Sequence, residues 1–70
     1  MANETILRME LTKRVLAKTG RRVRNLAVDC SGERVVLRGY AGSFHVKQLA
    51  QQSVREVLPD VRLENAIEVA

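Results

Sequence analysis

The stretch LAVDCSGERVVLRGYAG, residues 26–42, decides the fold of this 70-residue chain. Two runs rich in apolar residues flank the dipeptide Ser31-Gly32, which is typical of tight hairpin turns. A two-residue turn there pairs side chains whose numbers add to 63: Leu26 with Leu37, Val28 with Val35, and Asp29 with Arg34. This register keeps apolar pairs on one face and opposite charges on the other, as sheet pairing favours. The sequence therefore predicts a β-hairpin from Leu26 to Gly42.

A helix is expected before the hairpin. Residues 5–19 contain neither Gly nor Pro, and Gly20 follows as a typical left-handed helix end. Lys18, in the last turn, complements the helix dipole. The apolar residues fall on two stripes: Leu7, Leu11 and Val15 on one, Met9 and Leu16 nearly opposite, with Ile6 between them. Only one stripe can pack on a single sheet, so the other is expected to meet a second helix or a partner subunit.

A second helix and a third strand follow the hairpin. Ser43 is the expected N-cap, and Pro59 ends the helix because proline disfavours helical geometry in the residue before it. Between them, small and apolar residues recur at helical spacing: Val46, Leu49, Ala50, Ser53, Val54, Val57 and Leu58. The last segment alternates, with Val61, Leu63, Ile67 and Val69 on one face. Asn65 interrupts that face, and we expect a buried amide bonded to nearby backbone rather than a binding residue.

The element order αββαβ predicts an α+β fold in a single domain spanning residues 1–70. Two helices cover one face of a three-stranded mixed sheet of order 1-2-3, whose third strand is parallel to the second. This order sets Glu64 and Glu68 against Arg34 and Arg38 on the open face, which we interpret first as solvated surface and second as an interface.

Self-association is also a hypothesis, because a chain this short buries only about 60% of the surface its unfolded form exposes. A homodimer through the spare helix stripe is therefore a candidate. The candidate interface residues are Leu11, Leu16, Met9 and Tyr40.

The formal net charge of +4 is unevenly distributed. No acidic residue lies between Glu10 and Asp29, and this stretch holds half of the basic residues: Lys13, Arg14, Lys18, Arg21, Arg22 and Arg24. A structural interpretation is that these cations complement a helix end and keep the surface soluble. A functional interpretation is an anionic partner: a phospholipid surface, where each nearby Lys or Arg contributes about 1 kcal/mol, or nucleic acid phosphates. The only aromatic rings are Tyr40 and Phe44, which argues against a platform that stacks several bases.

Gly39-Tyr40-Ala41-Gly42 has the Gly-x-x-Gly spacing of the loop that clamps nucleotides in KH-type RNA-binding modules. Here the segment joins a strand to a helix, and neither middle residue is basic. We therefore favour structural roles: Gly32 in the hairpin turn, Gly39 for close approach of a helix to the sheet, and Gly42 for the turn into the second helix.

The residue pattern predicts no enzyme. Cys30 lies in the inward-facing row, whereas His45 lies in the first turn of the second helix, so they do not form a nucleophile and base. No cluster of Cys, His or carboxylate residues has metal-ligand spacing, and we expect neither a metal nor a cofactor. The sequence contains no apolar run of about 20 residues and no secretory signal at its start, so the chain as written is expected in the cytoplasm, with envelope association as an alternative.

The combined pattern resembles the BON domain, a family named for bacterial osmotic-stress and nodulation proteins. The hairpin with its Ser31-Gly32 turn, the glycine at Gly39 and the closing Asn65-x-Ile67-x-Val69 carry the resemblance, over about residues 6–69. It implies the same αββαβ fold. It further implies a non-enzymatic module that associates with phospholipid membranes or partner proteins, with Gly39 carried over only as a structural residue.

The leading hypothesis is a binding module that attaches to anionic phospholipid through the basic cluster. Two alternatives stay open: an RNA-binding module that uses the same cations with the Gly39–Gly42 segment, and an adaptor that binds a partner protein. A single copy without an export signal favours the adaptor over an envelope role.

Overall fold

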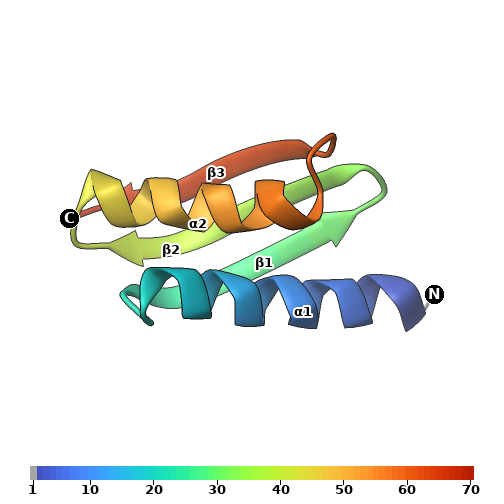
Figure 1. Ribbon diagram of the computed structural model, residues 1–70, viewed down its shortest axis with the longest axis horizontal. Coiled ribbons are helices and arrows are strands. Elements are labelled where there is room, and N and C mark those ends of the chain that lie inside the picture. Colours follow the sequence, from blue (N-terminus) through green and yellow to red (C-terminus); the bar gives the residue numbers. More distant parts are fainter. Residues whose placement is uncertain (1) are drawn as a thin grey trace.

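The computed structural model describes residues 2–70, with side chains from Glu4 onward, and has the predicted α+β fold. The elements are α1 (Ala2–Thr19), β1 (Val23–Ser31), β2 (Arg34–Ala41), α2 (Phe44–Val57) and β3 (Arg62–Val69). β1 pairs antiparallel with β2, and β2 pairs parallel with β3, in the order β1-β2-β3. Both helices lie on one face of the sheet, α1 along β1 and α2 over β2 and β3 (Figure 1). The predicted strand order and the single helical layer are confirmed.

The predicted helix ends are confirmed in detail. At the end of α1, the N–H of Arg21 donates to Leu16 O at 2.8 Å and the N–H of Gly20 donates to Ala17 O at 3.3 Å. These two bonds form a Schellman motif, with Gly20 at a φ of 62°. At the start of α2, the Ser43 hydroxyl accepts from the N–H of Val46 at 3.3 Å, as an N-cap does.

The core lies between the sheet and the two helices. Its buried residues come from all five elements, and the most completely buried apolar side chains are Leu11 and Val15 of α1, Val35 and Leu37 of β2, Val54 of α2 and Ile67 of β3. Thr19 is buried with them, and its hydroxyl donates to Val15 O at 2.7 Å. The stripe through Leu11 and Val15 is thus the one that packs, whereas Ile6 and Met9 stay 64% and 60% exposed. Within the described residues, Met9 of the second stripe and Ile6 beside it are therefore left largely uncovered, whereas Leu16 is half-buried.

The predicted hairpin register is wrong, because the turn lies one residue later in the chain than predicted. The two residues of the turn are Gly32 and Glu33, and the pairs add to 65: Val28 with Leu37, Asp29 with Val36, Cys30 with Val35, and Ser31 with Arg34. Gly32 has a φ of 60° at the first turn position, where the type II′ hairpin turn requires glycine. Moving the turn by one residue changes each sum by two, so every side chain keeps its predicted face.

A β-bulge changes the facing of β1 before this hairpin. The register shifts between Arg24 and Ala27, so that Asn25 and Leu26 lie opposite the single residue Gly39. Asn25 has a φ of 54°, a left-handed conformation that asparagine tolerates better than most residues. Because of the extra residue, odd-numbered Val23 joins the buried face that Val28 occupies further along the strand.

β3 forms an ion pair with β2 and a side-chain hydrogen bond with α2. Arg34 forms an ion pair with Glu64 on the open face, as expected from the strand order. Arg38, in contrast, lies beside Ala66, and Glu68 lies beside Tyr40, so the expected second pair does not form. Asn65 donates to Lys47 O at 2.9 Å, which confirms the prediction of an amide bonded to backbone.

Candidate functional site

Three arginines gather at one end of the molecule. Arg21 and Arg22 follow the end of α1, and Arg24 lies near the start of β1. At this end β2 finishes and α2 begins, at the left of Figure 1. A cavity of about 560 Å³ is lined there by the three arginines and by Tyr40, Ala41, Gly42, Ser43, Val46 and Ala70. We call Arg21, Arg22, Arg24 and the Tyr40–Ser43 segment the arginine corner.

The three guanidinium groups form no ion pair with any residue from Glu4 to Ala70. Arg22 donates through Nε to Thr19 O at 2.7 Å, and its backbone N–H donates to the same oxygen at 3.2 Å, which holds the start of this side chain against the end of α1. Arg24, Tyr40 and Glu68 lie side by side across the three strands, with Tyr40 in the middle. Glu68 forms no ion pair with Arg24. The corner therefore presents unneutralised positive charge to solvent.

The start of α2 adds to this field. The first turn of α2 contains no acidic residue, and a helix N-terminus carries partial positive charge with unpaired N–H groups. Tyr40 and Phe44, exposed by 44% and 61%, supply aromatic surface at the same end. An anion with an apolar portion is the kind of group that such a combination of cations and rings accommodates.

Gly42 lines the corner without a structural need for glycine. A Cβ placed on Gly42 would have no atom within 4 Å, and its φ is outside the left-handed region. The expectation that the turn into α2 needs glycine at this position is therefore wrong. Gly39, by comparison, lies inside β2, so the Gly39–Gly42 segment is mainly strand and not a separate loop of the KH kind.

The other half of the basic cluster lies elsewhere. Arg14 pairs with Glu10 at 3.0 Å on α1, and Lys18 pairs with Glu56 of α2 at 2.8 Å. Lys13 lies along a groove between α1 and β1, together with Arg8, Met9, Thr12 and Leu26. The fold thus divides a cluster that is continuous in sequence, and only its last three members reach the corner.

The predicted interface residues also separate. Leu11 is fully buried, so it offers no surface to a partner, and Leu16 is half-buried. Met9 and Tyr40 are exposed, but Met9 borders the groove between α1 and β1, whereas Tyr40 lies at the arginine corner. These four residues do not form one continuous surface.

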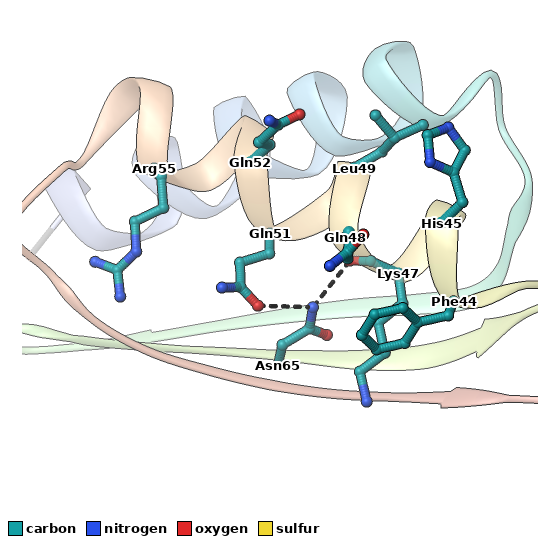
Figure 2. Close-up of a pocket in the computed structure, with 9 residues that line it drawn as sticks. All are labelled: Phe44, His45, Lys47, Gln48, Leu49, Gln51, Gln52, Arg55 and Asn65. Atoms are coloured by element: carbon teal, nitrogen blue, oxygen red, sulfur yellow. Dashed lines mark hydrogen bonds between the residues drawn. The ribbon is translucent and has the colours of Figure 1, made fainter.

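A second cavity, of about 480 Å³, follows the outer side of α2 (Figure 2). Asn65 of β3 lies at its floor, where its Nδ2 donates to Lys47 O and also lies 3.4 Å from Gln51 Oε1. Figure 2 shows Phe44, Lys47 and Arg55 reaching toward β3, while His45 and Leu49 lie farther from it. No sequence motif marked this groove, because α2 and β3 are brought together only by the packing.

Cys30 and His45 do not meet. Cys30 is half-buried in β1 and His45 is exposed on α2. Burial raises the pKa of the Cys30 thiol; Arg8 acts in the opposite direction, and Glu4 and Asp29 raise the pKa further. The thiol is thus less nucleophilic at neutral pH than a free cysteine.

Neither helix, as far as the structure describes them, combines the length and the apolar character needed to span a bilayer. No known family model, curated protein or solved structure matches the chain. The BON resemblance therefore stays a hypothesis.

Proposed function

We propose that the chain is a non-enzymatic binding module that attaches to anionic phospholipid surfaces through the arginine corner. The observation that carries the proposal is the convergence of Arg21, Arg22 and Arg24 on one cavity without ion-pair partners among the described residues. A phosphate-bearing surface suits several free guanidinium groups, because the planar guanidinium matches phosphate geometry and can donate two hydrogen bonds to it.

The aromatic surface favours a lipid over a free anion. Tyr40, which lines the corner, and Phe44, the first residue of α2, are both exposed. Aromatic side chains are enriched at the level of lipid headgroups, and cations beside an anionic leaflet each contribute about 1 kcal/mol. Three arginines with two rings thus support reversible attachment whose strength depends on salt.

Co-sedimentation with lipid vesicles tests this proposal. Retention of the native protein should rise with the fraction of phosphatidylglycerol in phosphatidylcholine vesicles and fall as salt is added. Removing charge at the corner with Arg21→Gln and Arg24→Gln should cost about tenfold or more in affinity, since two cations are lost. Arg38→Gln is the matched control, because Arg38 is an exposed arginine of the open sheet face that does not line the corner.

A single-stranded RNA titration of the same proteins distinguishes the alternative partner. RNA binding that depends on the corner, without vesicle retention, would show that the anion is nucleic acid. Equal retention on neutral vesicles, or equal losses in the Arg38 control, would remove the arginine corner from the mechanism.

A further inference from the structure

β3 forms one edge of the sheet, and its outer side is open to another strand. The N–H groups of Arg62 and Ala70 donate to Glu33 O and Ala41 O, both at 2.9 Å, on the β2 side. Main-chain groups of successive strand residues point to opposite sides, so the odd-numbered residues of β3 direct theirs outward. The residues that offer edge donors and acceptors are Leu63, Asn65, Ile67 and Val69.

Side chains of the protein itself cover only part of this edge. Asn65 Oδ1 accepts from the N–H of Ile67 at 3.3 Å, and Arg55 donates to Val61 O at 2.6 Å. An incoming strand can replace the first contact with a main-chain carbonyl, and a carbonyl oxygen can accept a second donor beside Arg55. No side chain from Glu4 to Ala70 forms a hydrogen bond with the main-chain groups of Leu63 or Val69.

We propose that β3 pairs antiparallel with β3 of a second copy of this chain, which joins the two sheets into one of six strands. Such a dimer is two-fold symmetric, so each residue i that meets residue j is matched by j meeting i. The symmetry axis passes between the two Asn65 residues, and both helical layers stay on the same face of the joined sheet.

The register centred on Asn65 is self-complementary. On the open face, Arg62 of each copy meets Glu68 of the other, which gives two opposite-charge pairs across the junction. On the helix face, Leu63 meets Ile67 and Val61 meets Val69, all apolar. The two Asn65 residues lie opposite each other, where asparagine side chains can exchange hydrogen bonds.

The neighbouring registers bring like charges together. Each side chain must keep its face, so the sum of paired residue numbers can change only in steps of two. Raising the sum by two sets Glu64 of each copy against Glu68 of the other. Lowering the sum by two sets the two Glu64 residues against each other. Directly opposed like charges destabilise a strand pair, so only the register centred on Asn65 avoids repulsion while using the full strand.

Two features favour strand pairing at the β3 edge over the β1 edge: free charges on β3 and the regular course of that strand. Arg62 and Glu68 are exposed, and within residues 4–70 neither forms an ion pair, so both are free to bind a second copy. β1, the opposite edge, is interrupted by the bulge at Asn25, and α1 packs along it. Bulges are a common means of preventing edge pairing, and β3 has none.

The proposed dimer does not cover the arginine corner. Each corner lies at the end of the molecule where β3 finishes, and antiparallel pairing sends the two ends in opposite directions. Dimerisation and lipid binding can therefore be tested independently.

Sedimentation equilibrium over a wide concentration range tests the dimer, starting from a monomer mass of 7.9 kDa. The native chain should reach twice that mass. Glu68→Arg alone, or Arg62→Glu alone, replaces two attractive pairs with two repulsive ones and should raise the dimer dissociation constant about tenfold or more. The double variant Arg62→Glu with Glu68→Arg restores opposite charges and should recover most of the association.

Cysteine cross-linking in a Cys30→Ser background checks the register. Opposed residues of a hydrogen-bonded antiparallel pair have Cα atoms about 5.5 Å apart, within disulfide reach, so Asn65→Cys should give a covalent dimer on oxidation. Ala66→Cys should not, because two copies of residue 66 are offset in this register. A strictly monomeric native chain, a dimer indifferent to both charge variants, or linkage through residue 66 would overturn the proposal, and the charge variants decide it if Asn65→Cys does not fold.

Discussion

Gly39 lies directly against the backbone of Arg24. A Cβ added to Gly39 would be 2.9 Å from Arg24 O, 3.0 Å from Val23 Cγ1 and 3.3 Å from Leu26 Cα. Gly39 also has a φ of 148°, which side-chain-bearing residues rarely adopt. The glycine thus allows the bulged part of β1 to press against β2. It was predicted to accommodate a helix, but the element it accommodates is the neighbouring strand.

This contact predicts a large effect of a single methyl group. Gly39→Ala should lower the free energy of unfolding by about 2–4 kcal/mol, because the added atom meets backbone that cannot move aside and the φ is strained. Urea denaturation followed by circular dichroism measures the loss. Gly42→Ala is the control: it meets no atom within 4 Å and should leave stability unchanged or raise it slightly. Similar midpoints for the two variants would contradict the packing at Gly39.

Asn65 predicts a second, smaller effect. Its amide links β3 to α2 through the bond to Lys47 O and accepts from the N–H of Ile67. Asn65→Ala should therefore cost about 1–2 kcal/mol in thermal or urea unfolding, because a half-buried carbonyl loses its donor. Gln51→Ala removes only the 3.4 Å contact with the same amide and should cost much less. An Asn65→Ala variant as stable as the native chain would show that this link does not hold α2 on the sheet.

The burial of Cys30 predicts how the alkylation rate of its thiol depends on pH. The thiolate is the form that reacts, and burial raises the pKa of this thiol, so a smaller fraction is reactive at a given pH. The rate of iodoacetamide alkylation should level off at a higher pH for the native protein than for the urea-unfolded protein. Comparing the pH at which the rate levels off separates ionisation from steric shielding.

The charges around Cys30 refine that experiment. Arg8 lowers the pKa of the thiol, so Arg8→Gln should move the native profile to still higher pH. Lys13→Gln removes a charge from the same helix and should leave the profile where it is, since Lys13 is not among the groups that shift this pKa. Native and unfolded profiles that coincide would contradict the burial of the thiol.

The hairpin shows how far sequence pattern reaches. Alternation assigned Val28, Val35 and Leu37 to the inner face correctly, because the face depends only on whether residue numbers are odd or even. It did not fix which residues are opposed, since Ser31-Gly32 and Gly32-Glu33 both satisfy that alternation. The structure decides between them through the positive φ of Gly32 at the first turn position.

The bulge at Asn25 was not predicted. Its only sequence signal is an asparagine, which tolerates a left-handed φ but occurs in many other settings. The extra residue becomes necessary only when Val23 must join the buried face that Val28 occupies further along the strand. That requirement comes from the packing of the whole sheet.

The sequence by itself determined the elements, their order and their inner faces beyond the bulge in β1, because helical and strand periodicity, the Gly20 helix end and the Ser43 cap act over a few neighbouring residues. The tertiary structure decided which cations are free. Lys18 is neutralised by Glu56, which lies 38 positions along the chain, whereas Arg21, Arg22 and Arg24 meet Tyr40 and Ser43 at one end of the sheet. Charge interactions depend on distance in space, and for residues this far apart in sequence only the folded chain sets that distance.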